Sequence, residues 1–241
     1  DTVAVLTAAQ NTLDESGIFP GIAVHRIDSP RTTQFWHVYY RIHRTQFTNP
    51  SPVRLHGRDL SGVLRASAIV HLAPVCDEAD ADILEVLPAG TFVGVTPQGW
   101  LRRWDAEGRV TQSPANWSAA DQVLGRADAV VMSVEDINGG WATAHRWAAQ
   151  ARLLVVTESE LGCTLFINGE TVHVAAPQVE QVDPTGAGDV FAATFFVALQ
   201  RGAPPTRAAE IANCLAAHSV TLPQMDGLPT PAVIARCMDN A

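Results

Sequence analysis

The residues best suited to chemistry lie in one short segment, Asp183-Pro-Thr-Gly-Ala-Gly-Asp189. Gly186 and Gly188 let the backbone turn sharply and leave no side chain over the amide groups. The apolar run over residues 190–201 is typical of a helix, so the turn leads directly into a helix N-terminus. We expect the N–H groups of Gly186, Ala187 and Gly188 to be unpaired there, where the helix dipole adds partial positive charge. Such a turn can hold a phosphate oxygen or a developing oxyanion.

Asp189 is unusual beside such a turn, because a carboxylate repels the anion that the amides would bind. Its position is explained if Asp189 accepts the proton of a hydroxyl that attacks the phosphate. The alternative is an ordinary capped helix, with Asp183 or Thr185 as the cap and Asp189 as an acidic residue of the first turn. The following helix is apolar nearly all round, which predicts burial in the domain centre, and Gly202 predicts its end. An anion hole on a central helix, next to a carboxylate, favours the interpretation as a site.

This segment resembles the carboxyl-terminal signature of the ribokinase-like (PfkB) family of carbohydrate and nucleoside kinases. The resemblance implies that Gly186, Ala187 and Gly188 stabilise the transferred phosphoryl group and that Asp189 is the catalytic base. It also implies ATP and Mg²⁺ as cofactors. A Walker A phosphate loop is a different device, and its Gly-x-x-x-x-Gly-Lys-Ser/Thr pattern does not occur in the sequence.

Two further segments resemble the nucleotide-binding parts of this family. Val156–Cys163 resembles the strand-end segment that lines the nucleotide phosphates, which implies contacts from Thr157 and Gly162, although Glu158 stands where the family usually has glycine. Thr157 could instead be a strand-end hydroxyl that caps a turn. The predicted helix over residues 205–220 would wall the adenine pocket, with Asn213 where a base-contacting residue lies. The alternative is a purely structural role for Asn213.

A metal role is implied for Ser133-Val-Glu-Asp136, which lies where the family usually carries Asn-x-x-Glu. In the family this segment helps to hold magnesium through water, so Ser133 and Asp136 take those places here. Magnesium prefers hard oxygen ligands and keeps several waters, which an aspartate can accommodate. The alternative is a helix N-cap at Ser133 followed by acidic residues of the first turn.

The segment Thr96–Trp104 resembles the family segment that carries an arginine near the substrate. The resemblance implies that Arg102 or Arg103 reaches the transferred phosphate with its forked donors. Alternatively, both arginines stack on neighbouring tryptophans as surface packing. Together with Pro30–Phe35, this segment resembles the inositol kinases within the family and points to a polyol substrate.

The elements that must position these residues are strands that alternate with helices, which predicts an α/β fold with a parallel sheet and helices on both faces. We predict strands at 67–72, 91–95, 129–132 and 153–157, and helices at 77–87, 135–150, 205–220 and 229–238. Ligands of such sheets bind at the carboxyl ends of the strands, where Ser133 and Thr157 fall. A hairpin is predicted over residues 163–175, with its turn at Asn168-Gly169.

The first fifty residues give a less regular pattern. Residues 2–16 have helical spacing and end at Gly17. Residues 22–27 and 32–42 predict two strands around a turn at Ser29-Pro30, and the second carries aromatic residues on both faces, so we expect it to lie against something on each side. The resemblance implies a small β lid within residues 18–50, which in the family often pairs with a second subunit, and an ordinary pair of strands is the alternative. The family's N-terminal strand and Gly-Gly region have no counterpart before residue 17, so we predict a single kinase domain over residues 1–241 without that region.

Composition excludes several classes of protein. The chain has 241 residues, of which 47% are hydrophobic and 17% charged, and its net charge of −9 argues against a nucleic-acid partner. A local basic cluster is expected to be a solvated face or to attract an anionic substrate; it comprises Arg41, His43, Arg44, Arg54 and Arg58. No apolar run is long enough to span a membrane. The four cysteines are far apart and predict neither a zinc site nor a disulfide framework, so we expect a cytoplasmic protein.

We therefore predict an ATP-dependent phosphotransferase that phosphorylates a hydroxyl of a small sugar or polyol, with a homodimer allowed by the lid region. Two alternatives remain open, a nucleoside kinase and a catalytically impaired nucleotide- or sugar-binding protein of the same fold. A nicotinamide-dependent oxidoreductase would need Gly-x-Gly-x-x-Gly after an early strand, and nothing before residue 100 supplies it.

Overall fold

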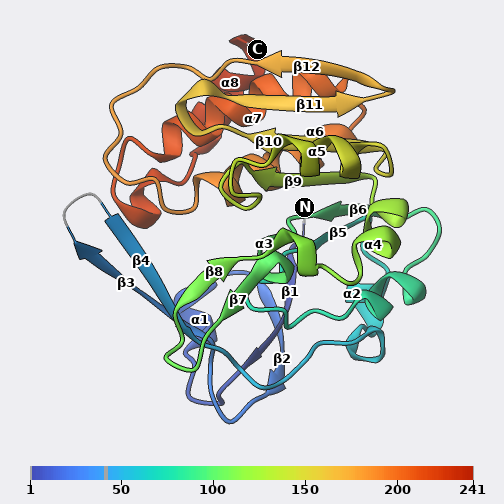
Figure 1. Ribbon diagram of the computed structural model, residues 1–241, viewed down its shortest axis with the longest axis vertical. Coiled ribbons are helices and arrows are strands. Elements are labelled where there is room, and N and C mark those ends of the chain that lie inside the picture. The colour runs from blue at the N-terminus through green and yellow to red at the C-terminus, as the bar shows by residue number, and fades with distance from the viewer. Residues whose placement is uncertain (1, 41–42, 241) are drawn as a thin grey trace. The chain divides into compact units, whose positions relative to one another are not determined.

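The computed structural model describes residues 2–40 and 43–240 (Figure 1). The chain divides into two compact units. The amino-terminal unit comprises residues 1–91 and 97–123, and the carboxyl-terminal unit comprises residues 92–96 and 124–241. The units differ in architecture, since the first is made of short paired strands and the second of a sheet covered by helices.

The carboxyl-terminal unit contains five strands hydrogen-bonded in the order β12-β11-β10-β9-β6. They are β6 (Phe92–Val95), β9 (Ala129–Ser133), β10 (Leu153–Thr157), β11 (Cys163–Ile167) and β12 (Glu170–Val174). The pairs β6–β9 and β9–β10 are parallel, whereas β10–β11 and β11–β12 are antiparallel. β9 and β10 are buried along almost their whole length, as expected for strands covered on both faces.

Helices cover both faces of these strands. The helices of this part of the chain are α4 (Ala120–Arg126), α5 (Trp141–Ala148), α6 (Ala187–Gln200), α7 (Pro205–Ser219) and α8 (Pro231–Asn240), with short 3₁₀ helices η4 (Ser159–Leu161) and η5 (Gln224–Gly227). Alternate residues of β9, β10 and β11 pack against α6 and α7 in one cluster that includes Val131, Val155 and Phe195. On the opposite face, Phe166 contacts Trp141 and His145 of α5. The sheet with helices on both faces confirms the predicted fold class.

Helix α6 lies on β6 because one residue leaves room for it. A Cβ atom at Gly94 would lie 2.4 Å from the ring of Phe196, so only glycine permits this approach. The buried side chains of α6 are those of Phe191, Ala192, Phe195 and Phe196, while Val197 on its other side is 36% exposed. The expectation of burial all round is therefore wrong, and α6 covers the sheet with one face.

Six strands of the amino-terminal unit form three two-stranded pairs. Its elements are β1 (Ala4–Ala9), α1 (Glu15–Ile18), β2 (Ala23–Asp28), β3 (Gln34–Tyr40), β4 (His43–Asn49), η1 (Gly57–Asp59), α2 (Gly62–Arg65), β5 (Ile69–Leu72), η2 (Ala81–Val86), α3 (Gln98–Leu101), β7 (Arg102–Trp104), β8 (Val110–Gln112) and η3 (Pro114–Asn116). β1 and β2 are parallel, whereas β3–β4 and β7–β8 are antiparallel.

Two predictions for the first fifty residues are wrong. The helix expected over residues 2–16 is replaced by strand β1 and the single turn α1, because β1 finds a parallel partner in β2 and this pairing overrides the helical spacing. The strands on either side of Ser29-Pro30 do not pair with each other, since β2 pairs with β1 and β3 pairs with β4. Ser29 is buried, and its hydroxyl donates to the carbonyl oxygen of Arg31, so this turn redirects the chain.

Two predicted helices are shorter than expected. Residues 77–87 contain only the 3₁₀ helix η2, which Asp80 caps by accepting the N–H of Asp82. Residues 135–140 form turns before α5, where Asn138 and Gly139 both have positive φ angles and the Gly139 N–H donates to the Val134 carbonyl oxygen. Residues in this conformation cannot continue a right-handed helix.

The cysteines differ from expectation in one pair. Cys214 of α7 and Cys237 of α8 form a disulfide, while Cys76 and Cys163 are free and buried. The separation of 23 residues between the two cysteines did not predict the disulfide, because α7 and α8 meet only through tertiary packing. Asn213 forms a hydrogen bond to the Cys163 thiol, but burial is the larger effect and raises the pKa of Cys163 to about 12.

Among the described residues, no helix has the length and apolar content needed to cross a membrane. The predicted basic cluster is only partly described, since Arg41 and the side chains of His43 and Arg44 lie outside the described residues. Arg54 forms ion pairs with Asp77 at 2.7 Å and with Asp80 at 3.5 Å. Its charge is therefore balanced within the amino-terminal unit.

Candidate active site

The glycine turn stands at the start of α6, as the sequence predicted. Gly186 is the N-cap with φ 83° and ψ −3°, a left-handed conformation that strains any residue with a Cβ atom. Ala187 is the first helical residue and Asp189 lies in the first turn. Gly186 and Ala187 are part-exposed, while Gly188 and Asp189 are exposed. The turn therefore presents a helix N-terminus and a carboxylate together at the surface of the carboxyl-terminal unit.

The amides of this turn are only partly used by the fold. The Ala187 N–H donates to the Pro184 carbonyl oxygen at 3.3 Å, a long bond, so the expectation of three unpaired amides needs correction at this residue. For Gly186 and Gly188 the described part of the chain supplies no partner for the N–H. A Cβ atom at Gly186 or Gly188 would meet nothing within 4 Å. The fold thus leaves both donors and the space above them open.

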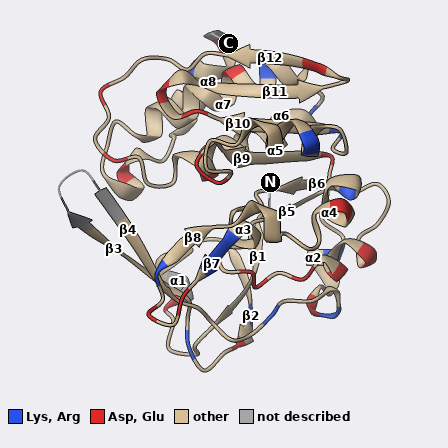
Figure 2. Ribbon diagram, in the orientation of Figure 1, with Lys and Arg blue, Asp and Glu red and all other residues tan. Residues whose placement is uncertain are grey.

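A second loop fixes the base of the turn. Asp183 accepts the N–H of Thr185 at 2.9 Å and the N–H of Gln224 at 3.1 Å. The N–H groups of Val182 and Asp183 both donate to the carbonyl oxygen of Val220. These hydrogen bonds, those to Thr185 first, hold the pKa of the Asp183 carboxyl below its usual range. Asp183 joins the turn to the loop that follows α7. The connection between β12 and α6 carries two acidic residues, Glu180 and Asp183, and red segments mark acidic positions along it in Figure 2.

Ser133, Asp136 and Thr157 come together at the carboxyl ends of β9 and β10. Ser133 and Thr157 are register partners, and the Val134 N–H donates to the Thr157 carbonyl oxygen at 3.0 Å. Asp136 is 3% exposed and accepts the Ser133 N–H at 2.9 Å, while its own N–H donates to the Ser133 hydroxyl at 3.2 Å. The reciprocal pair closes a turn, and no helix begins there because α5 starts only at Trp141.

Gly162 and Asn213 lie together at a different place, beside the end of β12. Gly162 has φ 103°, and a Cβ atom there would lie 2.1 Å from the carbonyl oxygen of Val174. The Asn213 amide donates to that same carbonyl oxygen at 2.9 Å and is buried. Glu158, which stands in place of the family's glycine, accepts the hydroxyl of Thr164 at 2.6 Å. The fold itself therefore requires Gly162 and Asn213, and a nucleotide contact by either stays a prediction.

The two arginines of the 96–104 segment belong to the amino-terminal unit, where both are engaged. Arg102 is 8% exposed, donates to the Val75 carbonyl oxygen at 3.1 Å, and lies over the ring of Phe35 with 4.9 Å between the guanidinium carbon and the ring centroid. Arg103 donates to the carbonyl oxygens of Trp100, Arg102 and Asn116. Stacking on neighbouring tryptophans is thus not what holds Arg102, since its aromatic partner is Phe35.

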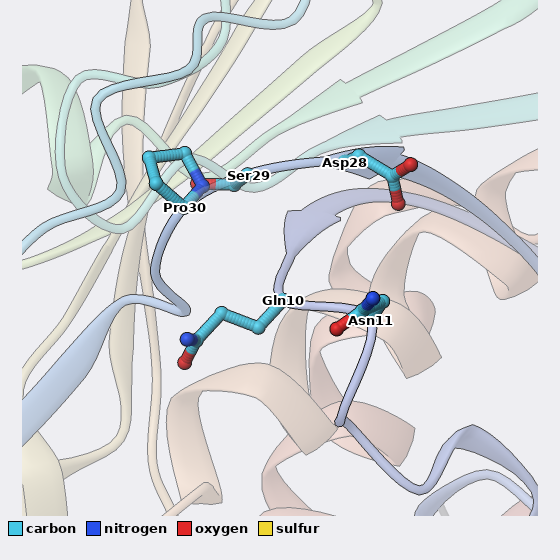
Figure 3. A pocket seen from close by; sticks show the side chains of 5 residues that line it. All are labelled: Gln10, Asn11, Asp28, Ser29 and Pro30. Atoms are coloured by element: carbon cyan, nitrogen blue, oxygen red, sulfur yellow. The ribbon is translucent and has the colours of Figure 1, made fainter.

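The amino-terminal unit has two polar depressions that sequence reasoning missed. The first has a cavity volume of about 250 Å³ and lies where β1 and β2 end; its lining residues are Gln10, Asn11, Asp28, Ser29 and Pro30 (Figure 3). The second, of about 380 Å³, is lined by Arg54, Asp80, Trp100 and Arg103 among others. The parallel pairing that creates the first depression was not predicted, so its position could not be inferred from the sequence.

Comparison with known proteins agrees with the resemblance carried by the glycine turn. Residues 115–231 match the pfkB family of carbohydrate kinases. The chain is 34% identical over 137 residues to an inositol 3-kinase of Zea mays, covering 56% of this chain and 34% of that enzyme. It is 36% identical over 130 residues to a bifunctional protein HldE of Caulobacter sp. (strain K31), covering 53% of this chain and 25% of that protein. The matched region is thus about a third or less of the length of these relatives.

Solved structures show the same fold over nearly the whole chain. A pyrophosphate-dependent kinase in the ribokinase family has a TM-score of 0.79 at 18% identity, covering 98% of this chain and 86% of that one. Ribokinase from Thermotoga maritima has a TM-score of 0.74 at 20% identity, covering 98% and 81%. The ribokinase-like fold and the resemblance to the PfkB family, with its inositol kinase members, are therefore confirmed.

Proposed function

We propose that this chain, which carries the pfkB family match and the ribokinase-like fold, is a phosphotransferase that transfers the γ-phosphoryl group of ATP to a hydroxyl of a small sugar or polyol. The observation that carries the proposal is the open space above Gly186 and Gly188. Gly188 lies in the first turn of a helix, where alanine would be more stable and its Cβ atom would meet nothing within 4 Å beyond the neighbouring helix backbone. Its lack of a side chain is explained if a ligand approaches the amides.

The chemistry follows from the groups at the turn. The oxygen of the substrate hydroxyl forms a bond to the γ-phosphorus, and the bond from that phosphorus to the oxygen bridging to the β-phosphate breaks. Asp189 accepts the hydroxyl proton, and the amides of Gly186 and Gly188 stabilise the charge on the transferred group, joined by the Ala187 amide once it releases its long bond to the Pro184 carbonyl oxygen. The chain has no lysine, since all sixteen of its basic Lys or Arg residues are arginines. Charge on the phosphates is therefore balanced here by main-chain amides, arginine and a metal ion.

Magnesium is part of the proposal, with Ser133 and Asp136 as its holders. The donor set fits, because a hydroxyl and a carboxylate are hard oxygen ligands. One Asp136 oxygen already accepts the Ser133 N–H. Ser133 and Asp136 would therefore hold a hydrated magnesium ion through its water ligands. When bound with the nucleotide, magnesium would neutralise phosphate charge.

The nucleotide and substrate contacts extend this proposal to three regions. The proposed nucleotide contacts are Thr157, Gly162 and Asn213. The amide nitrogen of Asn213 already donates to the Val174 carbonyl oxygen. Arg102 is the proposed substrate contact, and its burial implies that it acts from a fixed position. The ribbon β3–β4, which exposes Trp36 at 45% and Val38 at 50%, is the proposed lid within residues 18–50 and a surface for a homodimer.

A polyol or sugar is the proposed acceptor because one relative is an inositol 3-kinase. A nucleoside remains an alternative acceptor, since an adenosine kinase from Sinorhizobium meliloti has a TM-score of 0.75 with this chain. The proposed location is the cytoplasm, where ATP is available, and the proposed domain is a single kinase domain over residues 1–241.

The experiment that tests the proposal measures release of ADP from magnesium-ATP with a panel of polyols, sugars and nucleosides. A parallel series uses pyrophosphate, because a structure with a TM-score of 0.79 is that of a pyrophosphate-dependent kinase. Asp189→Asn is assayed beside the unchanged chain. Stimulation by one compound class, absent in the variant, is the expected result. ATP binding without stimulation by any compound would contradict a kinase and favour the impaired binding protein.

A further inference from the structure

A covalent bond connects two helices next to the glycine turn. The disulfide joins Cys214 of α7 to Cys237 of α8, so the segment between them is held at both ends. Cys237 is fully buried, whereas Cys214 is part-exposed. The two free thiols, Cys76 and Cys163, are buried elsewhere, and burial raises the pKa of each. This bond is thus the cysteine site on which a dithiol reductant can act.

The disulfide is connected to the turn through packing. Cys237 belongs to a small apolar cluster with Ile211 and Leu215, and Val190 of α6 packs against this cluster. Val190 is the residue immediately after Asp189, and its N–H donates to the carbonyl oxygen of Gly186. The side chains around the disulfide therefore support the first turn of the helix that carries the proposed base.

A second connection runs through the segment that the disulfide encloses. This segment holds the Val220 carbonyl oxygen and the Gln224 N–H, which bind the backbone and the carboxylate of Asp183. It is also fixed to the end of α7, since a Cβ atom at Gly227 would lie 2.1 Å from the Ser219 carbonyl oxygen. The base of the glycine turn is therefore attached to a loop whose two ends are joined by the disulfide.

From these two connections we infer that the Cys214–Cys237 bond is a redox-sensitive clamp on the glycine turn. Reduction by a dithiol begins with attack of a thiolate on the sulfur of Cys214, the part-exposed residue of the pair, and the Cys237 sulfur leaves and takes up a proton. The second thiol of the reductant then displaces Cys214, which also becomes a thiol, while the reductant becomes a disulfide. A disulfide restricts the conformations that the enclosed segment can adopt when it opens locally, and reduction removes this restriction. Reduction therefore loosens the 220–230 segment and the turn bound to it. The proposed cytoplasmic location fits this inference, because disulfides in that compartment usually serve catalysis or redox sensing.

The first test measures the mobility of the glycine turn in the absence of any ligand. Amide hydrogen exchange is compared between the oxidised chain and the chain treated with dithiothreitol, with thiol titration reporting two and four free thiols in the two states. Exchange of residues 183–190 and 220–228 should become at least about fivefold faster on reduction, while β9 and β10 stay unchanged. Unchanged exchange at 183–190 in the fully reduced chain, or four free thiols before treatment, would overturn the inference.

The second test deepens the proposed function and rests on it. Binding of magnesium-ATP should weaken by about fivefold or more on reduction, a typical size of coupling between two sites. Cys214→Ala should show the weaker binding with or without dithiothreitol, and Cys76→Ala, in the other unit, should keep the full response. Faster exchange at the turn combined with no ATP binding in either state would contradict the kinase proposal and leave the clamp standing. An equal response of Cys214→Ala and the unchanged chain to dithiothreitol would overturn the clamp.

Discussion

Two acidic turns of the carboxyl-terminal unit, residues 133–136 and residues 183–189, use their polar groups in different ways. In the first, Asp136 is buried and its carboxylate and N–H both bind Ser133, so the fold uses these groups. In the second, Asp183 holds the turn in place, while Asp189 and the N–H groups of Gly186 and Gly188 lie at an open surface. The two turns therefore differ in exposure, since the carboxylate of Asp136 is buried within the fold and Asp189 lies at the surface.

The largest expected effect comes from removing the proposed catalytic base. Asp189→Asn keeps the size of the side chain and removes a proton acceptor, so turnover should fall by about 10²–10⁴. The thermal midpoint and ATP binding should be unchanged, since Asp189 is exposed. Steady-state kinetics and thermal unfolding check this outcome. Turnover within tenfold of the unchanged chain would contradict the role of Asp189 as base.

Gly188→Ala should separate stability from activity at the same turn. The Cβ atom meets nothing within 4 Å beyond the neighbouring helix backbone, and alanine favours the helix, so the free energy of unfolding should rise by about 0.5–1 kcal/mol. The methyl group occupies the space over the amides, and loss of one anion-hole donor costs about 10²–10³ in rate. Urea unfolding and turnover are measured on the same sample. A stabilised variant with full activity would remove the amides of this turn from the proposed mechanism.

At the 133–136 turn, a substitution should affect stability more than it affects activity. Asp136→Ala leaves the Ser133 N–H without its acceptor and should lower the free energy of unfolding by about 1–3 kcal/mol. Asp136→Asn keeps an acceptor oxygen and is the matched control, with a smaller loss expected. Urea unfolding measures the stability, and a titration of turnover against magnesium measures the metal role. A weaker apparent magnesium affinity in Asp136→Asn supports that role, and an unchanged titration contradicts it.

The smallest expected effect concerns Asp183 and pH. Its hydrogen bonds lower its pKa in the folded chain below the ordinary value of about 4. Its contribution to stability is therefore fully present above that ordinary value and is lost as the pH falls through the lowered one. The difference in thermal midpoint between the unchanged chain and Asp183→Asn should shrink as the pH is lowered from about 5 to about 2.5. A difference that grows over this range would contradict the assignment.

The parts of the chain that the sequence predicted well are those specified by local signals. The hairpin turn at Asn168-Gly169 was predicted from two residues that accept positive φ angles, and both adopt them. The helix α6 and the glycine turn before it likewise follow from glycine placement and an apolar run. For the candidate site, the sequence located Asp189 and the amides but not the engagement of Ala187 or the anchoring role of Asp183.

The failures concern contacts between residues that are distant in sequence. Strand β1 has helical spacing and becomes a strand only because β2 lies beside it. Cys214 and Cys237 have no spacing signal, and they meet because α7 and α8 pack together. The packing role of Asn213 was allowed as an alternative, yet its partners on β12 and beyond could not be named without the hairpin position. Long-range pairing, rather than local preference, decided each of these cases.

The enclosed segment between the two half-cystines has a topological consequence for how the chain comes apart. Met225 is 69% exposed at the tip of this segment, a natural point for proteolytic attack. A single cut there would yield two polypeptides that remain covalently joined through Cys214 and Cys237. Helix α8 would then stay with the body of the protein on a non-reducing gel and separate from it only when a reductant is added, so a nick in this loop would pass unseen in an oxidising sample.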